Sequence, residues 1–187
     1  MQDGESKKQH AHCSGRRRLL TGLAAGLAAP LLPATLHATA GPRTLAFHNL
    51  HTGERLAVEY HDGIDYLPDA TSQIDHLLRD HRADQAYPMD PGLLDLLHQL
   101  RQLTDSQGRF EVISGYRSPN TNAKLRQQGK GVAKRSLHMQ GRAIDIRLAG
   151  VDTIRLRDAA ISLRAGGVGY YARSNFVHVD TGRFRTW

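Results

Sequence analysis

The sequence contains a single cysteine, Cys13, among 187 residues. An intramolecular disulfide is therefore excluded, and so is a zinc cluster built from several thiolates. The sequence also lacks any recognisable DNA- or RNA-binding motif and any patch of interleaved aromatic and basic residues, which disfavours a nucleic-acid partner. No internal repeat or low-complexity region follows the first 40 residues. These absences favour an ordinary globular protein without covalent cross-links.

The length and charge bound the number of domains and the kind of partner. A chain of 187 residues suits one domain and is short for two, and its hydrophobic fraction of 40% is ordinary. The formal net charge is +7, of which residues 1–40 contribute +3, from five Lys and Arg against two carboxylates. The remaining balance of +4 suits an anionic polymer, either nucleic acid or cell-wall murein (peptidoglycan), and does not choose between them.

The first 40 residues have the pattern of a targeting segment. Gly15–Thr21 resembles a twin-arginine export signal, with consecutive Arg residues followed by two Leu. The stretch from Leu19 to Leu36 is apolar, but Pro30 and Pro33 argue against a regular membrane-spanning helix. We therefore predict a twin-arginine-type signal peptide, which implies export to the periplasm.

The end of this segment indicates where the folded domain begins. Ala38-Thr39-Ala40 is typical of a cleavage site with small residues. We predict that residues 1–40 are removed and that residues 41–187 form the domain. The alternative is a retained N-terminal anchor, because the apolar stretch is long. A lipoprotein is not expected, because Cys13 precedes the apolar stretch.

Two histidines and one carboxylate form the most informative pattern in the chain. His138 precedes Asp145 by seven residues, with Gly141 between them, and Ala143–Leu148 alternates like a strand. The spacing suits a strand, a glycine turn and an adjacent strand. His178 lies on a second alternating segment and can reach the same sheet face. Two His and one carboxylate, with a fourth position left to water, are typical of a catalytic zinc site. The alternative is a set of hydrogen-bonded structural side chains.

These residues also carry a family resemblance. The segment Ser136–Asp145 has the pattern Ser-x-His-x-x-Gly-x-Ala-x-Asp and, with the strand His178, resembles the zinc signature of the D-Ala-D-Ala carboxypeptidase and murein endopeptidase superfamily. The metal site of that superfamily resembles that of the hedgehog N-terminal domain. The match is closest to the murein endopeptidase K (YcbK-like) family and covers roughly Arg43 to Trp187. It implies one Zn²⁺ ion held by His138, Asp145 and His178, and murein stem peptides as the partner.

A second segment adds a candidate substrate contact. The run Ser114–Pro119, Ser-Gly-Tyr-Arg-Ser-Pro, resembles the superfamily segment whose Arg faces the active site. By that resemblance Arg117 binds a substrate carboxylate or carbonyl oxygen, or stabilises oxyanion charge, for which a planar guanidinium is suited. The alternative is a structural Arg that ties down its loop. Ser136 is a further candidate for substrate binding, or it only shapes the turn.

The general base is the least certain part of the site. Many superfamily members have a catalytic Glu three residues before the last zinc ligand, and the residue at that position here is Asn175. Asp180 lies two residues beyond His178 and points to the same face, so we nominate it as the catalytic base. The alternative is that Asp180 orients a ligand without touching the substrate.

The remaining pattern predicts an α+β domain with an antiparallel sheet and packed helices, because strands and helices do not alternate regularly. Strands are predicted over 43–50, 55–60, 109–114, 143–148, 168–171 and 176–180, and helices over 67–82, 90–104, 120–129 and 152–165. The aromatic residues of the tail, Phe184 and Trp187, either pack back on the domain or line a groove.

Together these features predict a periplasmic zinc metallopeptidase. By the family resemblance, its reaction is the hydrolysis of peptide cross-links of murein, including bonds between two diaminopimelate residues. A carboxypeptidase that trims D-Ala is the enzymatic alternative. A non-catalytic, zinc-containing murein-binding module is another, because Asn175 replaces the expected Glu. A DNA-binding domain is a third, tested by steeply salt-dependent binding. Manganese or another divalent ion also suits this ligand set.

Overall fold

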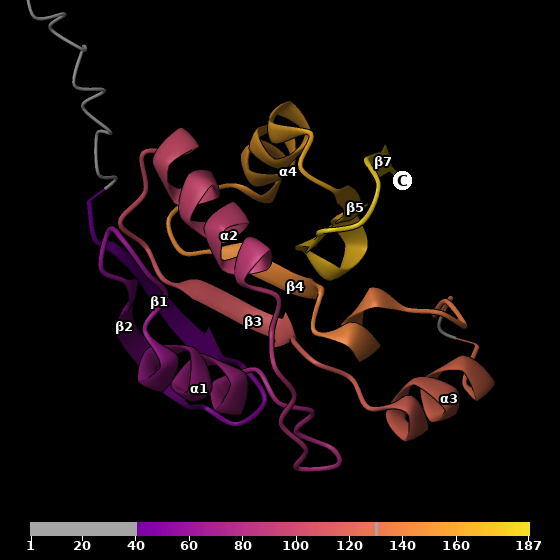
Figure 1. Cartoon of the computed structure of the whole chain (residues 1–187). Helices are drawn as coiled ribbons and strands as arrows, with labels where there is room; N and C mark the ends of the chain where they lie inside the picture. The colour runs from indigo at the N-terminus through magenta and orange to yellow at the C-terminus, as the bar shows by residue number, and fades with distance from the viewer. Residues whose placement is uncertain (1–40, 130) are drawn as a thin grey trace, which may run out of the picture. The chain divides into compact units, whose positions relative to one another are not determined.

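Seven strands in the described residues, 41–129 and 131–187, form one sheet in the computed structural model (Figure 1). The strands are β1 (Arg43–Asn49), β2 (Arg55–His61), β3 (Phe110–Ser114), β4 (Ala143–Leu148), β5 (Gly167–Tyr171), β6 (Phe176–Asp180) and β7 (Arg185–Thr186). Their order in the sheet is β2-β1-β3-β4-β6-β5-β7. The predicted signal peptide, residues 1–40, lies outside the described residues.

The sheet is mixed, although antiparallel pairing dominates as predicted. The pairs β1–β2, β3–β4, β4–β6 and β5–β6 are antiparallel, whereas β1–β3 and β5–β7 are parallel. The first parallel pair arises because β2 is followed by two helices, and this long connection returns the chain to the other side of β1. The second arises from β7, a short edge strand that the sequence pattern did not predict.

Four α-helices in the described residues confirm the predicted helical segments. They are α1 (Pro68–Leu77), α2 (Pro91–Leu103), α3 (Pro119–Gln127) and α4 (Thr153–Leu163). The helix predicted over 67–82 ends at Leu77, because the Asp80 carboxylate accepts hydrogen bonds from the backbone N–H groups of Arg82 and Ser118 and holds the chain in a turn. None of the helices in this part of the chain combines the length and apolarity that crossing a membrane requires.

One face of the sheet carries the hydrophobic core. The helices α2 and α4 lie on the near side of the central strands in Figure 1, and α4 contacts β4, β5 and β6. Buried side chains from these elements include Leu93, Leu97, Leu100, Leu156, Ile144, Ile146, Val177 and Val179. Because successive strand residues point to opposite faces, Asp145 and His178 lie on the face away from these helices. The α+β prediction is confirmed, and the strand register places two of the three proposed ligands together.

Candidate active site

Asp145 and His178 are direct neighbours across two central strands. The antiparallel pairing of β4 with β6 sets Asp145 opposite His178, and Asp145 Oδ1 lies 2.8 Å from His178 Nδ1. The two strands are held in this register by the buried core residues that alternate with them. The prediction that His178 reaches the same sheet face as Asp145 is confirmed.

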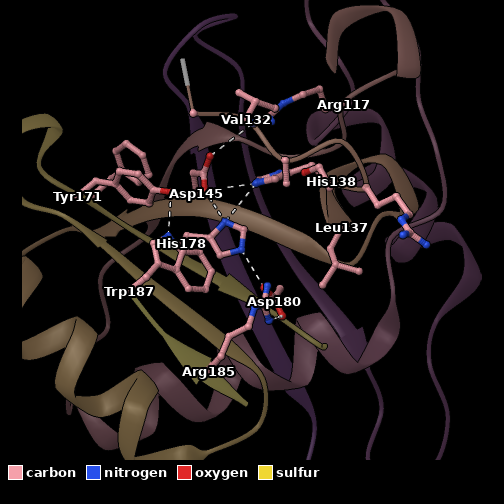
Figure 2. Close-up of a pocket in the computed structure, with 15 residues that line it drawn as sticks. Arg117, Val132, Leu137, His138, Asp145, Tyr171, His178, Asp180, Arg185 and Trp187 are labelled. Carbon is pink, nitrogen blue, oxygen red and sulfur yellow. Dashed lines mark hydrogen bonds and ion pairs between the residues drawn. The ribbon is translucent and has the colours of Figure 1, made fainter. Parts of the chain in front are cut away.

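His138 approaches this pair from a 3₁₀ turn, so the prediction that it lies on a strand is wrong. The turn, η1 (Leu137–Gln140), ends at Gly141, whose φ is 65°. A Cβ atom at this position would clash with the carbonyl oxygen of Pro88, so glycine is needed for both conformation and space. The turn leaves two residues before β4 begins at Ala143. It thereby aims the His138 imidazole back over the sheet at Asp145 (Figure 2).

The hydrogen bonds of the two imidazoles fix one nitrogen of each ring and turn the other toward Asp145. His138 Nδ1 lies 2.7 Å from the Gly115 carbonyl oxygen, which only accepts, so in the neutral ring Nδ1 carries the proton and Nε2 keeps its lone pair. His178 Nε2 lies 3.0 Å from Asp180 Oδ2 and His178 Nδ1 lies 2.8 Å from Asp145 Oδ1, so a carboxylate oxygen faces each nitrogen of this ring. A cation that replaced the proton between His178 Nδ1 and Asp145 would meet two imidazole nitrogens and a carboxylate oxygen, which is a donor set that metal ions accept.

The distances among the three groups also fit a metal ion. His138 Nε2 lies 3.2 Å from His178 Nδ1 and 3.3 Å from Asp145 Oδ1. In a tetrahedral zinc site with metal–ligand bonds of about 2.0–2.1 Å, neighbouring ligand atoms are about 3.3 Å apart. All three residues are buried, and their ligand atoms lie within 4.8 Å of one another. The residues present therefore fit a zinc ion.

The electrostatics of the site keep its carboxylate ionised. Burial alone would raise the pKa of Asp145, but its interactions with His138 and His178 outweigh burial and hold the pKa of Asp145 well below its usual range. Burial alone would lower the pKa of His178, but Asp145 and Asp180 outweigh burial and raise this pKa, so a positive charge is favoured beside these carboxylates. A divalent metal ion would supply such a charge, and several divalent metals accept a donor set of one carboxylate and two imidazoles.

Arg117 lies beside Asp145 with part of its hydrogen-bonding capacity unused. Its side chain is only 11% exposed, and its Nη2 lies 3.8 Å from Asp145 Oδ2 and 3.3 Å from Ser114 Oγ. The Nε atom is buried without a hydrogen-bond partner among the described residues. Burial lowers the pKa of Arg117, and the Asp145 charge counteracts it. Such a guanidinium can donate hydrogen bonds to an anionic or carbonyl group from outside the chain.

Asp180 lies behind His178, and its own contacts hold it there. The residue is 0% exposed. Arg185 donates from Nη1 and Nη2 to its two carboxylate oxygens at 3.0 and 2.7 Å, and the backbone N–H groups of Gly167 and Gly182 also donate to Oδ1. With the bond to His178, the Asp180 carboxylate takes part in five hydrogen bonds with four residues, which matches a carboxylate that orients a metal-binding imidazole.

A cleft of about 370 Å³ opens over the three metal-binding candidates. Arg117, Ser136 and Arg185 contribute to its walls, as does the loop 131–135, which precedes η1. The predicted substrate-binding residues Arg117 and Ser136 therefore lie together with the metal-binding candidates. A cleft with convergent polar groups is the usual form of a binding site for a small or extended ligand.

Asn175 does not take part in this site. It has a φ of 51° at the end of a short 3₁₀ turn, η2 (Ala172–Ser174), and its side-chain oxygen accepts a hydrogen bond from Thr153 at 2.9 Å. The side chain is thereby tied to the start of α4 and is absent from the residues lining the cleft. The Asn175 side chain therefore stabilises the local fold at the start of α4.

The sequence left open the position of one cleft residue, Trp187, and gave no role to two others, Tyr171 and Arg185. Trp187 was expected either to pack back or to line a groove, and it lines the cleft. Tyr171 and Arg185, also in the cleft wall, were missed. Strand alternation contains a signal for Tyr171, since Gly169 pairs with His178 and Tyr171 lies two residues further along on the same face. Arg185 could not be found in this way, because β7 was not predicted.

Comparison with known proteins extends over the whole described domain. A family model described as peptidoglycan L,D-endopeptidase MepK matches residues 37–187. The chain is 45% identical over 177 residues to the peptidoglycan L,D-endopeptidase MepK of Escherichia coli strain K12, an alignment that covers 93% of this chain and 97% of that relative. It is 46% identical over 172 residues to the probable peptidoglycan L,D-endopeptidase MepK of Haemophilus influenzae, covering 90% of this chain and 91% of that relative. The region matched by the family model contains every residue of the candidate site.

Proposed function

Because this chain belongs to the peptidoglycan L,D-endopeptidase MepK family, we propose that it is a zinc-dependent endopeptidase that hydrolyses peptide cross-links of peptidoglycan. The observation that carries the proposal is the buried cluster of His138, Asp145 and His178, in which two imidazole nitrogens and a carboxylate oxygen converge at the floor of a cleft. Zinc at such a site supplies Lewis-acid activation of a scissile carbonyl and of a water molecule.

The substrate is proposed from the relatives and from the cleft. Relatives that align over nearly the whole chain are named for an L,D-endopeptidase activity on peptidoglycan. We therefore assign this chain a bond between an L- and a D-configured centre, such as the bond between two diaminopimelate residues. Arg117 would bind a stem-peptide carboxylate or the scissile carbonyl oxygen, and its unpaired Nε supports this role. Ser136, in the cleft wall, would contact the same peptide.

For Asp180 the contacts favour positioning over direct proton transfer. A general base must come within hydrogen-bond reach of the water that it deprotonates. Asp180 is fully buried, and the His178 ring separates it from the ligand atoms that face the cleft. We propose that Asp180, held by Arg185, fixes the proton of His178 on Nε2 so that Nδ1 is presented to the metal. That Asp180 is the catalytic base remains a prediction, which the substitution Asp180→Asn tests.

Export is part of the same proposal. Peptidoglycan, for which the relatives are named, lies outside the cytoplasmic membrane, and the predicted twin-arginine signal over residues 1–40 would carry the folded protein to it. N-terminal sequencing of the protein recovered from the periplasm is expected to begin after Ala40. A protein that begins at Met1 and stays with the membrane fraction would instead support a retained anchor.

The test of the activity uses purified protein of measured zinc content, incubated with isolated sacculi that contain both diaminopimelate–diaminopimelate and D-Ala–diaminopimelate cross-links. Released muropeptides are identified by mass spectrometry. We expect the first kind of dimer to be lost. His138→Ala is expected to abolish both zinc retention and turnover. His76→Ala, a substitution of an exposed histidine outside the cleft, serves as the matched control and is expected to change neither.

The alternatives give distinct products. Loss of terminal D-Ala with intact dimers indicates a carboxypeptidase. Stoichiometric zinc with retention on sacculi and no product indicates a binding module. Turnover that survives His138→Ala would contradict the proposed metal site.

A further inference from the structure

Tyr171 presents its side chain to the cleft from the strand next to the zinc ligand His178. In the β5–β6 pairing, Gly169 lies opposite His178 and Tyr171 lies opposite Phe176, so all four residues belong to the same face of the sheet. The Tyr171 ring stacks on Phe176 with centroids 4.5 Å apart and planes 15° apart. The residue is 40% exposed, and Figure 2 shows its hydroxyl end directed toward the side of the cleft where Asp145 lies.

The hydroxyl of Tyr171 is oriented by the last residue of the chain. The indole Nε1 of Trp187 lies 3.0 Å from the Tyr171 hydroxyl oxygen. An indole N–H only donates, so the tyrosine oxygen is the acceptor in this bond. The Tyr171 O–H is then left to donate elsewhere, and its proton is turned away from the indole.

Trp187 is itself held in place by backbone hydrogen bonds and by packing of its indole. Its backbone N–H donates to the Val168 carbonyl at 3.2 Å, and its carbonyl oxygen accepts from the Tyr170 N–H at 3.0 Å. The indole lies so close to Gly169 that a Cβ atom there would overlap its ring. The indole also lies against two residues of the site. Its centroid is 5.2 Å from that of the His178 ring and 4.9 Å from the Arg185 guanidinium.

Besides Arg117 and Ser136, which are proposed to bind the peptide, the cleft offers few groups that can act at the scissile bond. Among the described residues that line it, the two carboxylates are Asp145, which is a proposed zinc ligand, and Asp180, which is buried behind His178. Asn175 is tied to Thr153 outside the cleft. In amide hydrolysis the carbonyl oxygen gains negative charge, and a preorganised hydrogen-bond donor beside it lowers the barrier.

We propose that the Tyr171 hydroxyl donates a hydrogen bond to the carbonyl oxygen of the scissile peptide, and that Trp187 is the residue that positions this hydroxyl. The inference rests on the proposed endopeptidase function. Tyr171 keeps its proton throughout, so the step is a hydrogen bond and no bond to hydrogen is broken. Tyr171 is then a catalytic residue that touches the reacting atoms, and Trp187 acts only through it.

The test compares the single substitutions Tyr171→Phe and Trp187→Phe, the double variant, and wild type on a purified cross-linked muropeptide. Removing one oxyanion donor typically lowers kcat by about 100- to 1,000-fold, so Tyr171→Phe is expected to lower kcat by about 100-fold, with KM changed less than about threefold. Trp187→Phe is expected to lower kcat by about tenfold. If Trp187 acts through Tyr171, the double variant is no slower than Tyr171→Phe alone, because coupled residues are not additive.

Tyr170→Phe is the matched control. Tyr170 is the neighbouring residue on the opposite face of β5, packed against the core and outside the cleft lining, and its substitution is expected to leave kcat unchanged. Zinc content and the melting temperature, measured for every variant, are expected to match wild type within error. These measurements separate a loss of chemistry from a loss of metal or fold.

Four results would overturn the inference or part of it. Tyr171→Phe with near wild-type kcat contradicts it, as does an increase in KM at unchanged kcat, which would mean that Tyr171 binds only the ground state. Independent effects of the two substitutions contradict the role of Trp187. A wild-type protein that binds zinc but releases no product contradicts the proposed function itself, and the inference falls with it.

Discussion

At the scale of the residue, the imidazole of His178 is held between two carboxylates, and they have different consequences. Asp145 faces the same side of the ring as the ligand atom Nδ1, whereas Asp180 fixes the proton on Nε2. A metal-binding histidine whose second nitrogen donates to a carboxylate is oriented and made a better ligand. The role of Asp180 therefore depends on whether its substitution lowers the zinc affinity or only the rate of turnover.

We predict that Asp180→Asn lowers the zinc affinity by about 10- to 100-fold, because the amide no longer fixes the His178 tautomer and no longer balances the Arg185 charge. Competition with a chelator of known affinity measures this change. Asp158→Asn, at a carboxylate paired with Arg157 on the surface, is the control and should leave the affinity unchanged. If Asp180→Asn retains zinc fully and loses only turnover, Asp180 is the base after all.

At the scale of the element, the turn η1 and its closing glycine decide where His138 points. Gly141 combines a left-handed backbone with close contact to the Pro88 carbonyl oxygen, and its own carbonyl accepts from the Asp90 N–H at 2.9 Å. The turn is thereby attached to the segment that leads into α2. A change at this position acts on backbone strain, on packing and on the position of the proposed ligand His138 together.

Gly141→Ala is expected to destabilise the protein by more than the ~1–2 kcal/mol that a left-handed non-glycine residue costs, and to weaken zinc binding. Gly150→Ala tests the backbone cost alone, since Gly150 has a φ of 81° and no atom near its Cβ position. Thermal melts and zinc titrations of both variants give the comparison. Equal melting temperatures for the two variants would show that the contact with Pro88 is unimportant.

At the scale of the whole molecule, a single carboxylate joins the helix α2 to the first hairpin of the sheet. Asp95 of α2 accepts hydrogen bonds from Arg43 of β1, from Tyr60 of β2 and from Tyr66, at 2.6, 2.9 and 2.8 Å. Burial raises the pKa of Asp95, but these hydrogen bonds outweigh burial and hold the pKa below its usual value. This carboxylate therefore links the helix layer to the edge of the sheet.

The link gives a pH dependence of stability with a definite sign. A carboxyl with a lowered pKa in the folded state contributes stability above its unfolded pKa of about 3.9, and that contribution is lost as the pH falls through this value toward the folded pKa. We expect Asp95→Asn to cost about 1–2 kcal/mol at pH 7, since the hydrogen bonds are to a charged group. The difference in melting temperature between wild type and Asp95→Asn should shrink below about pH 4. Asp65→Asn, at an exposed carboxylate, is the control; a difference independent of pH would contradict the assignment.

The sequence by itself determined the four helices, six of the seven strands in the described residues and the identities of the candidate ligands. Alternation over 143–148 and 176–180 is a local property of strands, and capping residues such as Ser118 mark the starts of helices. These strands and helices can therefore be recognised from the sequence alone. The motif from Ser136 to Asp145 likewise names its own residues. The short turn η1 was missed because its few local hydrogen bonds are supplemented by bonds to distant segments, such as that from the Arg117 N–H to the His138 carbonyl oxygen.

Only the tertiary structure decided how the cleft is completed. The parallel pairing of β1 with β3 follows from a long connection, and the two-residue strand β7 is defined solely by its partner β5. Because β7 exists only through that pairing, Arg185 and the adjoining Trp187 had no local signal that would bring them to Asp180 and Tyr171. Both contacts form only where the chain after β6 turns back to pair β7 with β5, and such a turn is set by packing, which a single sequence pattern does not encode.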